Sequence, residues 1–313
     1  MKVFVAGATG AIGIRVVPAL VQKGHQVIGV TRTPAKAEQL RQLGAEPVVV
    51  DALDEVGVKD AVAAAAPEVV VHQLTAIPHT IDPRTLDRQF AETNRLRTEG
   101  TDHLLEAARS AGVRRFVAQS FAMWVYARAG GPVKAENDEI GTDPPASVRE
   151  TLEGILHVER ALAGAPDIEG VALRYGMFYG PGTSIGTSGS IVEMVRKRRF
   201  PIVGRGSGVW SFIHVDDAAA ATVAAIEGGD PGIYNVADDE PAPVATWVPD
   251  LADAIGAPPP RRVPVWLARV VVGATGIAMM TEVRGASNAK AKRELGWQPR
   301  FASWRQGFRS GLG

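Results

Sequence analysis

Three glycines near the start of the chain could do chemistry through the backbone alone. Gly7, Gly10 and Gly13 form a GxxGxxG pattern, which reads GATGAIG in the sequence. Gly7 permits a tight turn, the bare Gly10 leaves room for a diphosphate, and Gly13 lets a helix lie close to a strand. Free N–H groups at a helix start bind phosphate. The pattern therefore predicts a dinucleotide site. The other predicted cofactor-binding residues in this turn are Thr9, Ala11 and Ile12.

Such a site requires a strand before the turn and a helix after it. Lys2 to Ala6 reads KVFVA, a β-branched run typical of a buried strand. Apolar residues at helical spacing follow the turn, from Ile14 to Val21. In this order of elements the glycine pattern indicates a nucleotide site; as an isolated pattern it would be equally consistent with a structural turn.

Strand-like and helix-like segments go on alternating as far as Tyr175. This alternation predicts an α/β fold with a doubly wound parallel (Rossmann) sheet. Ligands of such sheets bind outside the carboxyl ends of the strands. We expect further strands at residues 26–30, 46–50, 68–72, 115–119, 170–174 and 233–236, and helices that include 34–43, 61–66, 86–110 and 145–162.

After Gly176 the chain is rich in glycine, serine and proline, which predicts loops and short elements. We read this part as a smaller C-terminal substrate lobe. The predicted division assigns residues 1–176 and 212–236 to a dinucleotide-binding domain, and residues 177–211 and 237–313 to the lobe.

The end of the second predicted strand bears on the choice of cofactor. It carries no Asp or Glu for the ribose 2′-hydroxyl of NAD, but it has Arg32, with Lys36 one helical turn later. A guanidinium there suits a 2′-phosphate, so we expect NADP, with NAD as the alternative. Arg32 stacked on adenine or simply solvated would suit either cofactor.

Other strand ends supply the rest of the predicted cofactor site. Asp51 either accepts a hydrogen bond from the adenine amino group or caps a helix. His72 is more typical of a satisfied buried histidine than of a catalyst, whereas His79 is better placed to meet a substrate. The remaining predicted cofactor-binding residues are Ala52, Leu74, Thr75, Ala76, Asn94, Tyr175 and Met177.

Composition excludes several classes of protein. The 34 basic and 34 acidic residues balance, so no polyanionic partner such as nucleic acid is indicated. The absence of cysteine excludes disulfides and thiolate catalysis and fits a cytoplasmic protein. The first strand leaves no room for a signal peptide. The apolar stretch 263–280 contains Pro264 and Arg269, so we expect a buried or partner-facing helix and no membrane span. No metal site is expected.

Taken together, these blocks resemble the extended short-chain dehydrogenase/reductases, the NAD-dependent epimerase/dehydratase family, over nearly the whole chain. The resemblance rests on GATGAIG at 7–13, Asn94 with Gly100-Thr101, LRYGMFYGPG at 173–182, FIHVDDAA at 212–219 and LGWQP at 295–299. It implies an NAD(P)-dependent enzyme acting on a small carbonyl or hydroxyl compound. It also implies a homodimer formed through the helices at 86–110 and 145–162.

The chain departs from the family at its proton relay. The family uses a Tyr with a Lys four residues later, where the Lys lowers the phenol pKa. No Tyr-x-x-x-Lys occurs in this sequence. Alignment through Glu159 places Thr151 at the Tyr position and Ile155 at the Lys position, so the proton donor must be non-standard.

Two hydroxyl groups are left as candidate catalytic residues. Ser120 could orient a carbonyl, or it could be a hydrogen-bonded strand end. Tyr126 could donate a proton if its pKa were shifted, or it could be a packed wall of the pocket. The side chains that would make that pocket apolar could equally be core; they are Trp124, Met177, Phe178 and Trp210.

Three functional hypotheses follow. The first is an NAD(P)-dependent oxidoreductase or epimerase-like enzyme. The second is a non-redox isomerase or cyclase on the same fold. The third is a catalytically silent NADP(H)-binding protein. All three include the dinucleotide site, but only the first predicts a substrate-dependent change in nicotinamide absorbance.

Overall fold

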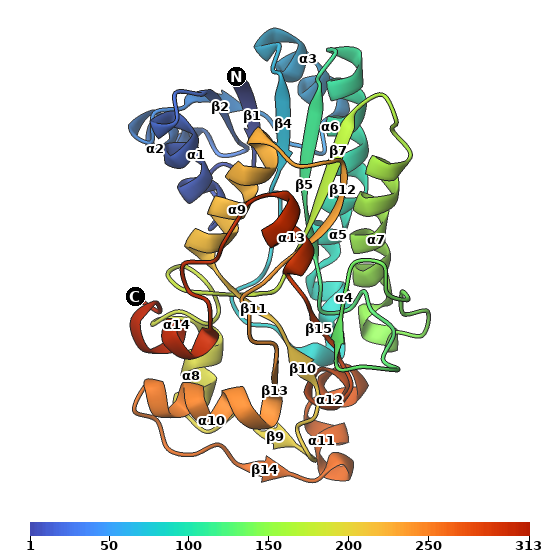
Figure 1. Ribbon diagram of the computed structural model, residues 1–313, viewed down its shortest axis with the longest axis vertical. Coiled ribbons are helices and arrows are strands. Elements are labelled where there is room, and N and C mark those ends of the chain that lie inside the picture. The colour runs from blue at the N-terminus through green and yellow to red at the C-terminus, as the bar shows by residue number, and fades with distance from the viewer.

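The computed structural model describes residues 1–313 and is built around a seven-stranded sheet of order β12-β7-β5-β4-β1-β2-β3 (Figure 1). All neighbouring strands in it are parallel, so their carboxyl ends meet at one edge. The predicted Rossmann-type α/β fold is confirmed. The strands are β1 (Lys2–Ala6), β2 (Gln26–Thr31), β3 (Glu46–Val49), β4 (Val69–His72), β5 (Arg115–Phe121), β7 (Glu169–Tyr175) and β12 (Gly232–Val236).

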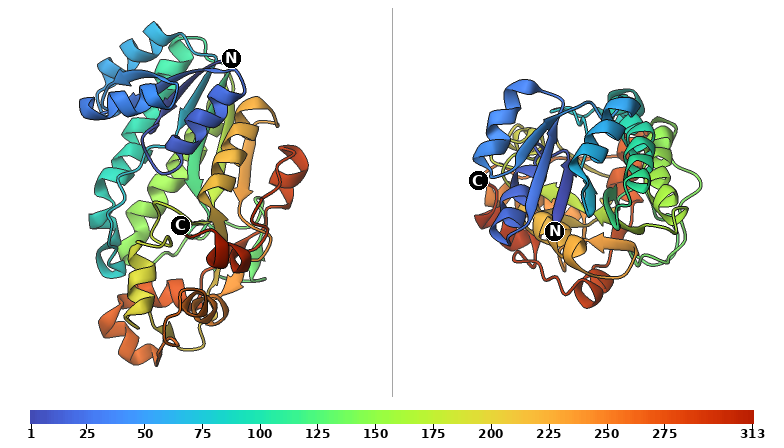
Figure 2. Two further views of the ribbon diagram at one scale, coloured as in Figure 1. Left: turned by 90° about the vertical axis from the view of Figure 1, so that its left-hand side faces the viewer. Right: turned by 90° about the horizontal axis from the view of Figure 1, so that it is seen from above.

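Helices cover both faces of the sheet (Figure 2). Alternation along a strand divides its apolar side chains between the two layers. In β1, Val3 and Val5 pack on the side of α1 (Gly13–Gln22) and α9 (Val215–Glu227), while Phe4 and Ala6 pack on the opposite side. The helices of that opposite side include α3 (Glu55–Ala65), α6 (Glu99–Ser110) and α7 (Arg149–Ala163).

A second core lies beyond the carboxyl edge of the sheet, in the lower part of Figure 1. It is rich in aromatic side chains, and Trp210 and Trp247 lie 4.8 Å apart between ring centroids. Its helices are α8 (Ser190–Arg196), α10 (Val244–Ala254), α11 (Val265–Val271), α12 (Gly273–Thr281) and α14 (Trp304–Ser310). Its strands form the pairs β9 (Ile202–Val203) with β14 (Arg262–Val263) and β10 (Val209–Trp210) with β13 (Ala242–Pro243).

Shorter elements join the two parts. Strand β8 (Met177–Tyr179) pairs with β11 (Phe212–His214), and β6 (Val133–Lys134) pairs with β15 (Gly285–Ala286). The remaining elements are η1 (Pro34–Lys36), α2 (Ala37–Gln42), η2 (Pro83–Thr85), α4 (Leu86–Gln89), α5 (Ala91–Arg97), η3 (Ala146–Val148) and α13 (Ala289–Glu294).

Two predicted helices are interrupted. The run 86–110 forms α4, α5 and α6, because the backbone leaves helical geometry at Phe90 and Thr98. The stretch 263–280 forms α11 and α12, which meet at Gly273 with a φ of 68°. The single buried or partner-facing helix predicted there is therefore two helices, and α11 exposes Trp266 and Val270. No helix combines the length and apolar character that crossing a membrane requires.

Candidate functional site

The glycine turn leaves β1 and enters α1 in a conformation that larger residues could not adopt. Gly7 has a φ of 90°, and a Cβ there would lie 2.5 Å from the Gln73 carbonyl oxygen. A Cβ on Gly13 would lie 2.2 Å from the Gly7 oxygen. By contrast, a Cβ on Gly10 would meet only the Gly7 oxygen, at 3.3 Å. The outer two glycines therefore hold the turn together, and Gly10 leaves its outer side open.

The start of α1 offers hydrogen-bond donors that no group of the protein uses. The N–H groups of Ala11, Ile12 and Gly13 have no backbone or side-chain acceptor. No acidic side chain stands in the first turn of α1, and Ile12 at its N-cap cannot cap the helix with a side chain. Unpaired amides at the positive end of a helix dipole are suited to a diphosphate. The turn therefore fits the dinucleotide that its sequence predicts.

Arg15 connects this turn to the neighbouring part of the chain. Its Nη1 donates to the Ala11 carbonyl at 2.7 Å, its Nη2 to the Pro181 carbonyl at 3.1 Å, and its Nε to Asp216 Oδ1 at 2.6 Å. One guanidinium thus links α1 with the loop after β8 and with the first turn of α9. This contact fixes the position of the free amides relative to that loop and to α9.

The predicted ribose end of the site is exposed and charged. Arg32 follows β2 and forms an ion pair with Glu92 of α5. Asp51 accepts a hydrogen bond from the Leu53 N–H at 3.0 Å, whereas Asp54 caps α3 by accepting from the Gly57 N–H. Arg32 therefore already has a carboxylate partner, with which a 2′-phosphate would have to compete.

The segment after β4 is held by two side chains. The His72 Nδ1 accepts from the Leu74 N–H at 3.2 Å, and its Nε2 lies 3.2 Å from the Leu96 carbonyl oxygen. Burial lowers the pKa of His72 to about 4, so the ring is neutral at physiological pH. The Ala76 N–H donates to Thr93 Oγ1 at 2.9 Å. His72 is thus a buried structural histidine, as its strand-end position suggested, and His79 is exposed.

The position of the family's Tyr is occupied by a hydroxyl that stabilises the helix. The N–H and Oγ1 of Thr151 donate to Asp87 Oδ1 at 2.9 and 2.8 Å. Asn94 Nδ2 donates to the same Thr151 Oγ1 at 3.4 Å, while Asn94 Oδ1 has no partner. Ile155, at the Lys position, is fully buried in the aromatic core. Neither residue can act as the missing relay.

Ser120 belongs to a buried ionic network. Its Oγ donates to Glu159 Oε1 at 2.6 Å. Arg174 contacts both oxygens of Glu159, with Nε to Oε1 at 2.7 Å and Nη2 to Oε2 at 2.6 Å. A bidentate pair of this kind has strong directional preferences. The structure therefore places Ser120 inside strand β5, at the edge of a fixed charge pair.

Tyr126 ends the same network. Its hydroxyl donates to Asn235 Oδ1 at 2.6 Å and accepts from Arg174 Nη1 at 3.1 Å. Burial raises the pKa of Tyr126, and the contacts with Arg174 and Asn235 offset only part of this effect. A phenol that is harder to ionise is a poorer proton shuttle near neutral pH. Catalytic roles for Ser120 and Tyr126 stay predictions, and these contacts count against them.

The end of β7 is less open than expected. The Tyr175 hydroxyl lies 2.7 Å from Thr222 Oγ1 and accepts from Gln73 Nε2 at 3.1 Å, and burial raises its pKa to about 12. Its ring therefore packs inside the domain, although the residue lies at the ligand-binding edge. Met177, two residues on, is half-buried and lines a small cavity.

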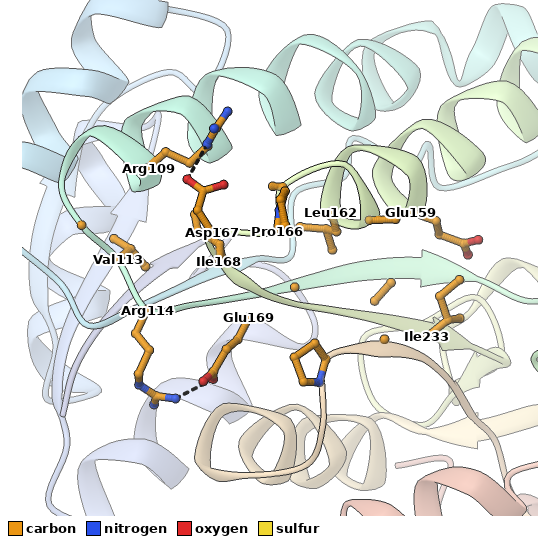
Figure 3. Close-up of a pocket in the computed structure, with 17 residues that line it drawn as sticks. Arg109, Val113, Arg114, Glu159, Leu162, Pro166, Asp167, Ile168, Glu169 and Ile233 are labelled. Carbon is orange, nitrogen blue, oxygen red and sulfur yellow. Dashed lines mark hydrogen bonds and ion pairs between the residues drawn. The ribbon is translucent and has the colours of Figure 1, made fainter.

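Two larger cavities lie at different ends of the sheet. One of about 250 Å³ opens after β5 and is lined by residues that include Met123, Trp124, Tyr126, Arg128 and Leu152. This is the candidate substrate cavity, because it lies on the side of the carboxyl edge. The other, of about 690 Å³, lies near the amino ends of β5, β7 and β12, between the ion pairs Arg109–Asp167 and Arg114–Glu169 (Figure 3). Its position away from the glycine turn separates it from the predicted chemistry.

Sequence reasoning did not single out two buried arginines. Arg174 pairs with Glu159, as described. Arg97 in α5 is buried beside Gly154 of α7 and has neither a hydrogen-bond acceptor nor an ion-pair partner. Burial lowers the pKa of Arg97 to about 10.

Comparisons with known proteins agree with this geometry. The model of the NAD dependent epimerase/dehydratase family matches residues 3–237. A 3-diazoavenalumate denitrifying reductase from Streptomyces sp. is 46% identical over 98% of this chain and 99% of its own length. A 2-alkyl-3-oxoalkanoate reductase from Stenotrophomonas maltophilia is 28% identical over 82% of this chain and 77% of its own.

Solved structures show the same architecture. A UDP-glucose 4-epimerase from Thermus thermophilus in complex with NAD superimposes with a TM-score of 0.74 at 25% identity, covering 100% of this chain and 98% of the other. A UDP-glucose 4-epimerase from Thermotoga maritima with UDP-glucose gives a TM-score of 0.77 at 22% identity, covering 100% and 97%. The second comparison concerns the fold alone.

Proposed function

Because the chain belongs to the NAD-dependent epimerase/dehydratase family, with an NAD(P)-dependent oxidoreductase or epimerase-like function, we propose that it is an NADP(H)-dependent reductase of a diazo group. The observation that carries the proposal is an open glycine turn combined with a site in which Thr151 and Ile155 replace the family's relay. The enzyme has the residues to hold a dinucleotide but lacks the usual means of protonating an alkoxide.

The reaction must therefore develop little negative charge on substrate oxygen. Reduction of a carbonyl creates an alkoxide that needs a proton donor, and here the Thr151 hydroxyl is engaged with Asp87 while the pKa of Tyr126 is raised. A diazonium group is cationic, so hydride addition neutralises its charge and calls for no acid from the protein. This difference favours a diazo substrate over a ketone.

A bound reduced nicotinamide would supply a hydride. Its transfer to the terminal nitrogen of the diazonium would form an N–H bond as one N–N π bond is lost, which gives a neutral diazene. Loss of the N–H proton and of N₂ would leave the C–N bonding pair on carbon, which takes up a proton to form the C–H bond of the product. The task of this chain is to hold the two reactants in line and exclude water. The relative at 46% identity is named for a denitrifying reduction of a diazo compound, in line with this proposal.

We assign NADP(H) rather than NAD(H) on the exposed cations that follow β2. Arg32 and Lys36 lie at the ribose end, where no acidic residue replaces them. Ala11, Ile12 and Gly13 would hold the diphosphate through their N–H groups. The segment Leu74 to Ala76, predicted to bind the cofactor from its position after β4, would line the same site.

The test uses benzenediazonium and NADPH under anaerobic conditions. We expect enzyme-dependent loss of nicotinamide absorbance, with one N₂ released and one benzene formed for each NADPH oxidised. A reaction without enzyme is the control for spontaneous reduction. Turnover of the diazonium without NADPH oxidation would support a non-redox enzyme instead. Dinucleotide binding without turnover of this probe would contradict the reductase proposal.

A homodimer through α5, α6 and α7 is also proposed, as the family resemblance implies. The face that these helices expose is charged and includes Arg95, Glu99, Asp102, Glu153 and Arg160. An interface of this kind depends on ion pairs that salt weakens. Sedimentation should show a dimer that dissociates between low and high salt, whereas a monomer at low salt would contradict it. We place the protein in the cytoplasm, in keeping with its lack of cysteine.

A further inference from the structure

A guanidinium without a counter-ion lies where the second core meets the carboxyl edge of the sheet. Arg284 donates from Nη1 to the Glu282 carbonyl at 2.9 Å and from Nη2 to the Arg128 carbonyl at 2.6 Å. Its Nε is buried and has no hydrogen-bond partner. The Glu282 carboxylate pairs instead with Arg128 Nη1, at 2.5 Å. Arg128 Nη2 also lies 3.9 Å from Asp143 Oδ2. Both carboxylates therefore face Arg128, and Arg284 pairs with neither of them.

Arg284 lies beside the edge of the sheet where the reaction is predicted. Arg284 lines a cavity of about 10 Å³ together with Met123, Gly176, Met177 and Trp210. Gly176 and Met177 directly follow β7, so the cavity adjoins the edge where the dinucleotide is expected. Met123 also lines the cavity of about 250 Å³. Because methionine side chains adapt their rotamers easily, a ligand can join the two cavities by moving Met123.

The backbone that carries Arg284 is fixed on both sides. The Val209 N–H donates to the Val283 carbonyl at 2.9 Å, and the Ala286 N–H donates to Ser211 Oγ at 2.7 Å. A Cβ on Gly285 would lie 2.7 Å from Pro241 Cβ, which shows how closely this segment is packed. The guanidinium is therefore pre-organised, which reduces the entropy lost when a ligand binds.

Arg284 is half-buried and its guanidinium contacts only carbonyl oxygens. A planar guanidinium is well suited to a carboxylate. We propose that Arg284 is a specificity-determining residue that binds the carboxylate of an aromatic, monoanionic substrate in this cavity. The proposal rests on the proposed function, because that function makes the cavity the substrate site. One guanidinium without a carboxylate partner fits one carboxylate better than the diphosphate of a sugar nucleotide. Trp124 and Trp210 supply aromatic walls on the two sides of Met123.

The test compares 4-hydroxycinnamate with its neutral amide by calorimetric titration into the NADP⁺-saturated protein. We expect the wild type to bind the carboxylate at least tenfold more tightly than the amide. Arg284→Met should remove this preference, and Arg284→Lys should retain part of it because the charge remains without the planar fork. Arg262→Met, a change at an exposed arginine of the same lobe, should leave the preference unaltered.

Equal binding of the two probes by the wild type, or binding of neither, would overturn the inference, as would a preference that survives in Arg284→Met. The wild-type comparison alone decides the matter if Arg284→Met does not fold. Because this readout is binding, it does not depend on diazo reduction. A wild type that does not turn over the diazonium but still prefers the carboxylate to the amide would refute the proposed reaction alone.

Discussion

At the scale of single residues, cofactor choice depends on a competition for Arg32. Its guanidinium pairs with Glu92, and both side chains are exposed. A 2′-phosphate that displaces Glu92 would gain hydrogen bonds to a charged group, worth about 1.5–3 kcal/mol each before solvent screening. Arg32→Ala should therefore weaken NADPH binding about tenfold and leave NADH binding unchanged, as measured by fluorescence titration.

Glu92→Gln is the matched variant, because it removes the competing carboxylate but keeps the size of the side chain. It should tighten NADPH binding. If the ratio of NADPH to NADH affinity is the same in the wild type and Arg32→Ala, the 2′-phosphate assignment is wrong.

Substitutions at Tyr126 and Glu159, in the buried network with Arg174, distinguish a structural role from a catalytic one. Tyr126→Phe removes one hydroxyl and should lower the free energy of unfolding by about 1–2 kcal/mol, with kcat changed less than threefold. Glu159→Gln leaves Arg174 buried without its carboxylate and should lower the free energy of unfolding by about 3–5 kcal/mol. Urea unfolding and steady-state kinetics measure the two effects. A hundredfold loss of kcat in a stably folded Tyr126→Phe would restore Tyr126 as the proton donor.

At the scale of elements, the strands and their order along the chain were predictable because buried parallel strands are continuous apolar runs. Strand β1 was predicted with its observed bounds, Lys2–Ala6. The breaks at Phe90 and Thr98 were not predictable, since apolar spacing continues across them. At the second break, the Thr98 hydroxyl donates to the Asn94 carbonyl at 3.0 Å. The spacing of apolar residues gives no information about such a side-chain-to-backbone hydrogen bond.

In the candidate site, the local backbone features were predictable and the side-chain partners were not. Glycine spacing and strand ends identified the turn at residues 7–13, because those signals are local. The partners of Arg32, Ser120 and Tyr126 lie 60, 39 and 109 residues away along the chain, so only tertiary structure reveals them. Once engaged by these partners, side chains that looked free in the sequence have much less freedom to act on a substrate.

Helix α14 makes a prediction about packing between elements. A Cβ on Gly307 would lie 2.2 Å from the Tyr179 ring, which is fully buried. Gly307→Ala should therefore displace α14 or the ring and lower the free energy of unfolding by about 1–3 kcal/mol. Gly228→Ala is the control, because a Cβ there meets nothing within 4 Å. Equal unfolding midpoints in urea for the two variants would show that the α14 contact is looser than described.

At the scale of the whole molecule, stability should fall in mild acid because of His72. Its pKa is about 4 in the folded protein and about 6.5 when unfolded, so between these values the unfolded chain binds the extra proton. The contribution of the neutral His72 ring to the free energy of unfolding is therefore complete above pH 6.5 and is lost as the pH falls toward 4. From pH 6.5 to 5 this amounts to about 2 kcal/mol.

The comparison is between the wild type and His72→Gln, which has no titrating ring. The difference in their unfolding free energies should change by that amount between the two pH values. A difference that stays constant with pH would mean that His72 titrates normally.

The account of the whole molecule depends on a dinucleotide bound at the glycine turn, and calorimetric titration of NADPH tests this most directly. Gly10→Val places a side chain on the open side of the turn, whereas Gly228→Val places one where nothing lies within 4 Å. The wild type and Gly228→Val should bind one NADPH per chain, and Gly10→Val should bind at least a hundredfold more weakly at an unchanged melting temperature. Equal binding by a folded Gly10→Val, or no binding of NADPH or NADH by the wild type, would contradict the account.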